Sequence, residues 1–158
     1  MDDICEELGF DPQFLYELAD ASSSLYKVFD MPKRSGGFRT ICVPADKLKN
    51  IQRLILDGFL GKIDMPAHMH GGIKGRSIAT NAEVHVGKPL VVNIDLKDFF
   101  QSISVEAVRS IFSRIYNLDE NAAEIFVKLT TYGNSLPQGA PTSSLLASKR
   151  WHLSNILE

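Results

Sequence analysis

The chain has 158 residues, of which 44% are apolar and 23% charged, and its formal net charge is −2. This composition predicts a globular protein with a buried core and excludes a disordered or low-complexity chain. No window approaches the roughly 20 consecutive apolar residues of a membrane span. The acidic start MDDICEELGF is unlike a signal peptide. We therefore expect a soluble, cytoplasmic protein without a membrane partner.

The charged residues are unevenly distributed along the chain. Residues 1–20 carry seven acidic and no basic side chains, whereas residues 21–80 carry ten basic and four acidic ones, a local charge of +6. Such a local excess favours contact with a polyanion, and it equally fits a solvated surface balanced by the acidic N-terminus. Cys5 and Cys42 are far apart in sequence and indicate ordinary packing residues rather than a zinc site or a disulfide framework.

The first half of the chain predicts helices on either side of a hairpin. Asp11 and Pro12 are typical of a helix N-terminus and open a short helix. The stretch FDMPKRSGGFRTICVP predicts a hairpin with its first strand ending near Met31 and its tip at 32–37. From Asp46 onward, apolar residues at helical spacing predict an amphipathic helix with a basic exterior. Its apolar positions are Leu48, Ile51, Leu54, Ile55 and Phe59.

The second half predicts one buried strand among helices. The glycine-rich stretch 61–76 precedes a small polar segment that can start a helix. The apolar run at 89–95 predicts a strand covered on both faces. Ser104 and Asp119 are expected to cap two helices that run to about residues 116 and 132. NSLPQGAPTSS predicts a loop, because prolines and glycine interrupt regular structure, and a last helix follows it.

A hairpin separate from the central strand favours an α+β fold over a doubly wound sheet. We expect an N-terminal helical segment at 1–25 and a basic hairpin-and-helix region at 26–85. A third region, 86–158, is expected to be built on the central strand and the helices after it.

Asp95 ends the apolar run LVVNID. A buried strand places its last side chain rigidly, as a metal ligand or catalytic carboxylate requires. An aspartate at a strand end also caps or forms turns, and this second interpretation stays open from the residue alone. Asp98 is likewise either a second ligand or the cap of the following turn.

Five segments, in order, resemble the reverse transcriptases of bacteria and most closely those of retrons. FDMPKRSGGFRTICVP resembles the fingers hairpin, KLKNIQRLIL the helix after it, and GGIKGRSIATNAEVH the next block, in which NAEVH matches the N-A-x-x-H signature of retron enzymes. NIDLKDFFQSI resembles the first catalytic motif of the palm, and SLPQGAPTSS the loop that holds the incoming nucleotide. The resemblance covers about Tyr26 to Ser144.

The resemblance implies RNA-directed DNA polymerisation on a right-hand polymerase fold, with fingers, an incomplete palm and no thumb in this chain. Asp95 would bridge two Mg²⁺ ions, or Mn²⁺ in their place, and the Leu96 carbonyl would complete one coordination shell. Phe100 would be the steric gate that excludes a ribose 2′-hydroxyl and so selects deoxynucleotides.

The same resemblance assigns further binding residues. Arg39 would meet the triphosphate, with Lys33 or Arg34 as its partner at the hairpin tip. Gln138 would approach the sugar and base of the nucleotide.

Four more residues would contact nucleic acid. Lys74 and Arg76 would touch template or primer phosphates, although each taken alone fits a surface charge. Asn81 and His85, four apart, would share a helical face and bond to structural RNA or to each other. For His85 a purely structural role is the alternative.

The second catalytic motif of the family, an aromatic residue followed by x-Asp-Asp, does not occur in the sequence, and the Asp2-Asp3 pair lies in the wrong lobe. We therefore interpret the chain as a truncated reverse transcriptase that is inactive alone. A second polypeptide, or self-association, would complete the palm. Residues 145–158 depart from the family pattern.

The other expected partners are an RNA template, a DNA or RNA primer, deoxynucleoside triphosphates and a structured non-coding RNA. The retron resemblance implies a role in antiviral defence. Two further functions stay open beside this interpretation. The first is a non-catalytic nucleic-acid-binding regulator derived from a reverse transcriptase. The second is an unrelated α/β domain in which Asp95 serves other phosphate or metal chemistry.

Overall fold

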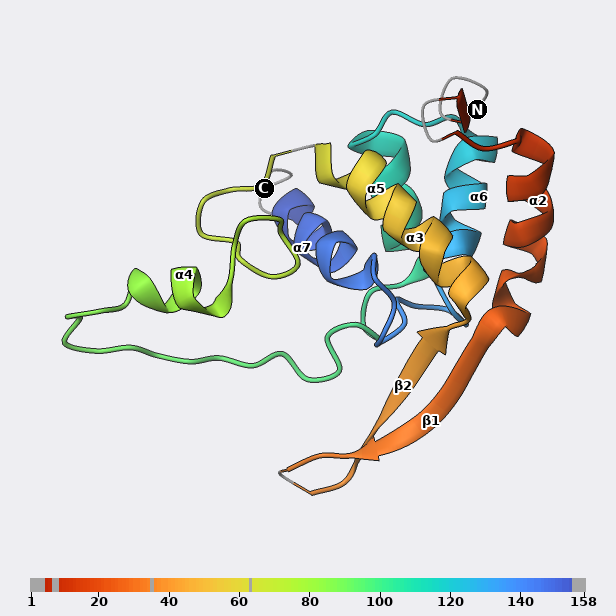
Figure 1. Ribbon diagram of the computed structural model, residues 1–158. Helices are drawn as coiled ribbons and strands as arrows, with labels where there is room; N and C mark the ends of the chain where they lie inside the picture. The colour runs from red at the N-terminus through yellow and green to blue at the C-terminus, as the bar shows by residue number, and fades with distance from the viewer. Residues whose placement is uncertain (1–4, 7–8, 35, 63, 155–158) are drawn as a thin grey trace.

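The computed structural model describes residues 5–6, 9–34, 36–62 and 64–154. Figure 1 shows a body of packed helices, a two-stranded hairpin that projects from it, and a long arm that carries a short helix. The body contains α2 (Pro12–Ala21), η1 (Ser22–Leu25), α3 (Asp46–Gly58), η2 (Leu60–Lys62), α5 (Val105–Arg114), α6 (Glu120–Thr130) and α7 (Ser143–Ser154). The hairpin is β1 (Tyr26–Pro32) and β2 (Phe38–Pro44), and the arm carries α4 (Ile78–Glu83). The mixture of helix and strand agrees with the predicted α+β class.

Side-chain caps start the helices where the sequence predicts. The Asp11 carboxylate accepts a hydrogen bond from the backbone N–H of Gln13 at 2.8 Å, and Asp119 accepts from Ala122 at 2.8 Å. Ser104 caps α5 in the same way. These oxygens satisfy donors that the first turn of a helix leaves unpaired. Helices α5 and α6 both end two residues before their predicted ends.

The predicted hairpin is confirmed. Its strands are antiparallel, with a register that runs from Tyr26 opposite Pro44 to Pro32 opposite Phe38. The backbone N–H of Lys33 closes the turn by donating to the Gly37 carbonyl at 2.9 Å. Ser35, within the predicted tip, lies outside the described residues, as do Asp2 and Asp3.

An aromatic cluster forms the centre of the core. The rings of Phe112 and Phe126 lie 5.3 Å apart, centroid to centroid, and Phe59 lies 5.2 Å from Phe126 and 4.7 Å from Tyr116. Phe112 and Phe126 are fully buried. Buried apolar residues of α2, α3, α5, α6 and α7 belong to the same core cluster. Burial of these rings removes a large apolar area from water and so stabilises the body.

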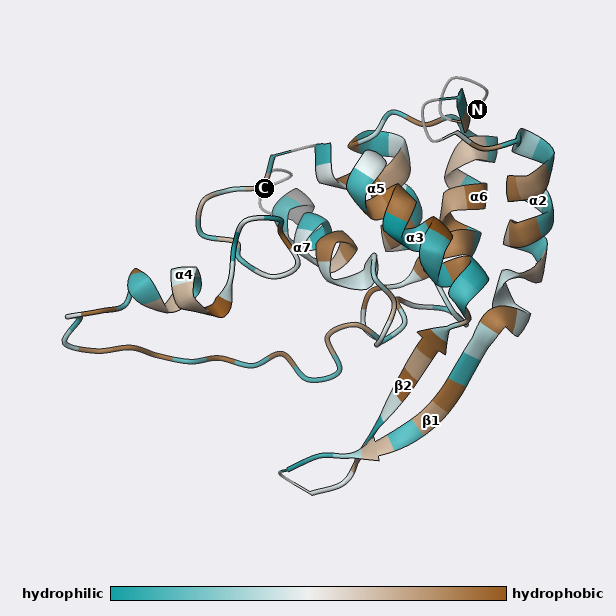
Figure 2. Ribbon diagram, viewed as in Figure 1, coloured by the Kyte–Doolittle hydropathy of each residue, from teal (hydrophilic) through white to brown (hydrophobic). Residues whose placement is uncertain are grey.

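The structure corrects the prediction of a buried strand at 89–95. Residues 90–96 form no regular secondary structure, and their apolar side chains are exposed, Ile94 to 85% and Leu90 to 76%. Figure 2 shows this stretch as a run of apolar residues on the extended arm. A β-branched run becomes a strand only when neighbouring strands pair with its backbone, and the sheet in the described ranges consists of β1 and β2 alone.

The apolar stripe of α3 is corrected at one position. Leu54, placed on the stripe, is 48% exposed, whereas Gln52 is fully buried. The Gln52 amide donates to the hydroxyl of Tyr26 and to the carbonyl of Leu129, each at 2.8 Å. Gln52 therefore ties the base of the hairpin to the end of α6, and these two bonds offset the cost of burying its NH2 group, whereas its Oε1 has no hydrogen-bond partner among the described residues.

The buried core includes residues from all three predicted regions, among them Leu15, Leu48 and Phe126. The division at residues 25 and 85 stays a prediction. Among the residues that the structure describes, no helix is both long and apolar enough to cross a membrane.

Candidate functional site

The hairpin presents the predicted triphosphate-binding cations on an exposed surface. Arg39 lies opposite Met31 in the register, and its guanidinium donates to the Met31 sulfur at 3.1 Å. Lys33 and Arg34 lie beyond the ends of the strands and are exposed. Within the described ranges, none of these three cations forms an ion pair with a carboxylate. Their charge is therefore available to an external phosphate.

The SLPQG loop packs directly on strand β2. The backbone N–H of Cys42 donates to the Gln138 carbonyl at 2.8 Å. Gly139 has a φ of +129°, and a Cβ built on it would lie 2.9 Å from the Cys42 carbonyl oxygen. Only glycine permits both this backbone conformation and this close approach. Arg39 lies three residues before Cys42, about 10 Å along the strand, so Gln138 and Arg39 belong to directly joined elements.

Further hydrogen bonds fix the loop from its other side. The Ser143 hydroxyl donates to the Pro137 carbonyl at 2.7 Å, and the Leu136 N–H donates to Ile103 at 3.2 Å. Thr142 is fully buried, and its hydroxyl oxygen has no hydrogen-bond partner among the residues that are described. The loop is therefore held between β2 and the start of α7.

Asp95 lies on the exposed coil of the arm rather than at the end of a buried strand. Leu96, beside it, is 46% exposed. Across the described part of the chain, no three His, Cys, Asp or Glu side chains gather closely enough to hold a metal ion. These residues alone therefore do not fit a site for two divalent cations, which needs several carboxylate ligands.

The residues after Asp95 form a compact turn. Asp98 has a φ of +49°, and its carbonyl accepts a hydrogen bond from the Ser102 N–H at 2.9 Å, which favours the turn interpretation over a metal ligand. Phe100 is half-buried against the core, with its ring centroid 5.7 Å from that of Phe99. The role of Phe100 as a steric gate stays a prediction.

Arg76 is occupied by the protein itself. Its guanidinium donates to the backbone carbonyls of Met65, Pro66 and Met69, and the bond to Met65 is 2.7 Å long. The planar fork of arginine fits such a group of carbonyls. This arrangement favours a structural role for Arg76, which fixes the loop at 65–69. Lys74 is exposed and has no such partners among the described residues.

We expect Arg76→Met to lower the free energy of unfolding by about 1–3 kcal/mol, because it leaves three carbonyls without their donor. Urea unfolding followed by circular dichroism measures this loss. Lys74→Met is the matched control, and as an exposed substitution it should change stability by less than about 0.5 kcal/mol. Equal stability of the two variants would contradict the structural role of Arg76.

Asn81 and His85 do not share a helical face. Asn81 lies in α4, which begins with a capping box at Ser77 and ends at Glu83. Beyond the C-cap residue of that helix, His85 forms a turn in which its N–H donates to the Ala82 carbonyl at 3.0 Å. Because α4 ends at Glu83, only Asn81 lies on the helix, and the spacing of four residues does not place His85 on the same face. Their contact with RNA stays a prediction.

Lys149 is a charged residue that the sequence did not predict in the core. It is 1% exposed, its ammonium lies 3.5 Å from the Met65 sulfur, and it sits 5.4 Å from the ring centroid of Tyr116. Burial lowers the pKa of Lys149 to about 8, and the nearby negative charge of Asp64 opposes this shift. Its place three and four residues after Leu146 and Leu145 was the sequence signal for burial.

Two side chains at the base of the hairpin, Tyr26 and Cys42, have raised pKa values. Burial raises the pKa of Tyr26 to about 12, and the hydrogen bond from Gln52 lowers it in part. Burial likewise raises the pKa of the Cys42 thiol. Both side chains are therefore uncharged at neutral pH, where they act as packing groups between the hairpin and the body.

Comparison with known proteins identifies relatives over most of the chain. It is 32% identical over 149 residues to the Retron Se72 reverse transcriptase of Salmonella heidelberg (strain 579083-10), a match that covers 94% of this chain and 39% of that protein. It is 35% identical over 126 residues to the Retron Ec86 reverse transcriptase of Escherichia coli, covering 78% of this chain and 39% of the relative.

A third relative, the Retron Mx65 reverse transcriptase of Myxococcus xanthus, is 43% identical over 86 residues, which are 54% of this chain and 20% of that protein. No family model matches the chain. The chain spans about two fifths or less of the length of these relatives. The chain therefore belongs with the retron-type reverse transcriptases and corresponds to a part of such a protein.

Proposed function

We propose that the chain is the fingers and the first part of the palm of a retron-type, RNA-directed DNA polymerase. The observation that carries this proposal is the attachment of the SLPQG loop to β2. It joins the element that bears Gln138 to the element that bears Arg39. In the proposed role both residues meet one deoxynucleoside triphosphate, Arg39 through its phosphates and Gln138 at its sugar and base. Lys33 or Arg34 assists Arg39 at the hairpin tip, and Phe100 excludes the 2′-hydroxyl.

The proposed catalysis depends on divalent metal, with Mg²⁺ as the physiological ion and Mn²⁺ as a substitute. Asp95 supplies one carboxylate, and the carbonyl of Leu96 supplies a further oxygen. The remaining ligands come from outside the described residues, on a second polypeptide or a second copy of the chain. Support comes from the exposed apolar stretch 90–96, which offers unpaired backbone groups and apolar side chains to a partner strand.

The proposed nucleic-acid partners are an RNA template, a DNA or RNA primer and a structured non-coding RNA. The local charge of +6 over residues 21–80 supports binding to these polyanions. Lys74 contacts phosphates in this proposal, while Asn81 and His85, exposed on the arm, contact the structured RNA. The setting we infer is the cytoplasm, with antiviral defence as the biological role.

A non-catalytic regulator that retains the nucleic-acid surface is the second candidate. The exposure of Asp95, away from any group of three metal-binding side chains in the described ranges, favours it. In that role Asp95 has no chemical task, so Asp95→Ala would leave RNA binding and the biological phenotype unchanged.

Primer extension on an RNA template, with Mg²⁺ and deoxynucleotides, tests the proposal. We expect no extension by the purified chain alone. Extension is expected once a second polypeptide carrying the rest of a retron reverse transcriptase is added, and Asp95→Ala should reduce it by about a hundredfold or more. Lys97→Met, which removes an exposed cation near Asp95 and leaves the carboxylate, is the control. Extension that is insensitive to Asp95→Ala would contradict the catalytic proposal and favour the regulator.

A further inference from the structure

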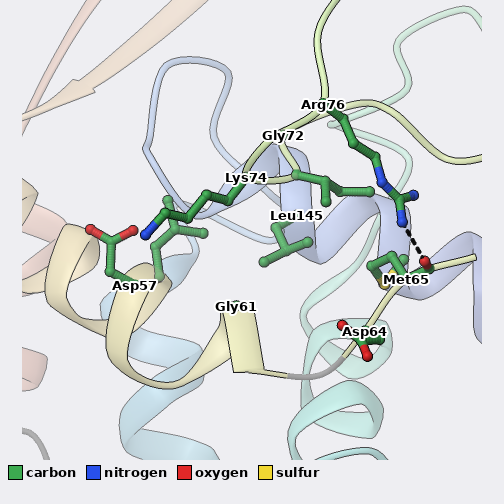
Figure 3. A pocket seen from close by; sticks show the side chains of 10 residues that line it. Asp57, Gly61, Asp64, Met65, Gly72, Lys74, Arg76 and Leu145 are labelled. Carbon is green, nitrogen blue, oxygen red and sulfur yellow. Dashed lines mark hydrogen bonds between the residues drawn. The ribbon is translucent and has the colours of Figure 1, made fainter. Parts of the chain in front are cut away.

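A pocket of about 450 Å³ lies between the end of α3, the loop at 61–76 and the start of α7 (Figure 3). Its apolar walls come from Leu56, Met65, Ile73 and Leu145. This volume lies within the range typical of small-molecule sites. The described lining of the pocket contains neither Asp95 nor any residue of the hairpin or the SLPQG loop, and Lys74 is the one residue that it shares with the nucleic-acid contacts proposed above.

At two glycines that line the pocket, the backbone lies very close to neighbouring segments. Gly72 has a φ of +69°, and a Cβ built on it would lie 2.6 Å from the Cβ of Ser144. A Cβ on Gly61 would lie 2.9 Å from the Leu56 carbonyl oxygen. The Ser148 hydroxyl donates to the carbonyl of Gly71 at 3.1 Å and so ties the loop to α7. Two glycines and this bond hold the loop against the helix and define the shape of the pocket.

The charged groups of the pocket balance. Asp57 and Lys74 lie together on one side of it, and Asp64 lies on the other (Figure 3). Arg76 also lines it, but its guanidinium already serves three backbone carbonyls. Among the described lining residues two carboxylates oppose two cations, so neither a phosphate nor a polyamine is favoured by net charge. The fitting ligand is a neutral one that carries both donors and acceptors.

Asp57 and Lys74 offer two acceptor oxygens beside a donor. No ion pair joins these two side chains in the described part of the chain, so both are available to a ligand. Guanine presents the complementary edge, with its N1–H and N2–H donors next to the O6 acceptor. The Watson–Crick edges of adenine and the pyrimidines do not carry two neighbouring N–H donors followed by a carbonyl oxygen, so they do not match this arrangement of acceptors and donor. The apolar walls can cover the faces of a planar ring.

We propose that this pocket binds a guanine base, either as a free nucleoside or as an unpaired guanine extruded from RNA. The Asp57 carboxylate accepts from N1–H and N2–H, Lys74 donates to O6, and Leu145 and Ile73 contact the ring. An unpaired base suits this mode, because single-stranded RNA exposes its Watson–Crick edge to protein side chains.

Isothermal titration of the purified chain with guanosine tests the proposal, in buffer without metal or triphosphate. We expect saturable binding by guanosine, binding about tenfold weaker by inosine, which lacks the N2 amine, and none by adenosine. Asp57→Asn and Lys74→Met should each weaken guanosine binding about tenfold or more. Lys88→Met, an exposed lysine outside the pocket, should leave it unchanged. Circular dichroism verifies that each variant is folded.

A second arm distinguishes the source of the base. A uridine-tract RNA with one central guanosine is compared with the all-uridine RNA of equal length. A preference for the first that is lost in Asp57→Asn assigns the pocket to RNA, whereas binding of guanosine alone assigns it to a free nucleoside. Absence of guanosine binding, or equal binding of guanosine and adenosine, would overturn the proposal. Because no polymerisation is measured and Asp57 has no part in the proposed polymerase site, the Asp57→Asn result leaves the proposed polymerase function untouched.

Discussion

Gly139→Ala is expected to lower the free energy of unfolding by about 2–5 kcal/mol. Two effects combine. The φ of +129° is strained for any residue with a Cβ. The added methyl group would also lie 2.9 Å from the Cys42 carbonyl oxygen and 3.3 Å from the Ile41 side chain. The loop must then move away from β2, and this movement lengthens or breaks the hydrogen bond from the Cys42 N–H to the Gln138 carbonyl.

Gly133→Ala is the matched control for this prediction. Gly133 also has a positive φ, +60°, but nothing lies within 4 Å of a Cβ built on it. Its substitution should cost about 1 kcal/mol from backbone strain alone. Urea unfolding measures both losses, and hydrogen exchange at the Cys42 amide reports whether the loop has left the hairpin. If the two variants lose equal stability, the close contact between loop and hairpin is refuted.

Lys149 is expected to make the protein more stable as pH rises from about 8 toward 10. In the folded protein its pKa is lowered to about 8, whereas an unfolded lysine keeps its proton to about pH 10.5. Between these values the unfolded chain binds more protons, so the free energy of unfolding increases with pH. Below pH 8 both states are protonated, and the cost of burying the charge is fully present. The slope approaches about 1.4 kcal/mol per pH unit.

Lys149→Met isolates this contribution. Methionine has similar length and suits the neighbouring Met65 sulfur and Tyr116 ring. The wild-type minus variant difference should rise between pH 8 and 9.5, because methionine does not titrate. Taking the difference cancels the opposing effects of Cys42 and Tyr26, whose raised pKa values disfavour the folded state at high pH. A pH-independent difference would refute the lowered pKa.

Local sequence signals predict the elements whose stability is local. Asp11, Ser104 and Asp119 act as helix caps because the acceptor and its donor lie within three residues of each other. The hairpin was predictable because its turn and the strands it joins are contiguous. The prediction of a strand at 89–95 was wrong for the opposite reason. The strand propensity of this stretch depends on pairing with backbone elsewhere, and the described residues supply no neighbour to it.

The site shows the same division. The SLPQG loop and the hairpin were each predicted from sequence, but their contact through Gly139 and Cys42 required the fold. The occupation of Arg76 by three carbonyls and the burial of Lys149 are tertiary effects, invisible to charge patterns that treat every basic residue as a surface group. Gln52 was detectable in principle, because a polar residue between Leu48 and Ile55 lies on the apolar face of α3.

The most direct measurement is primer extension by a chimera in which this chain replaces the matched region of the Retron Se72 reverse transcriptase. The polypeptide then contains the rest of that reverse transcriptase in a single chain. We predict extension of a primer on RNA with Mg²⁺ and deoxynucleotides, and its loss in the Asp95→Ala chimera. A folded chimera that extends no primer, or one that extends equally well with alanine at position 95, would contradict the proposal that Asp95 is a catalytic carboxylate of an RNA-directed DNA polymerase.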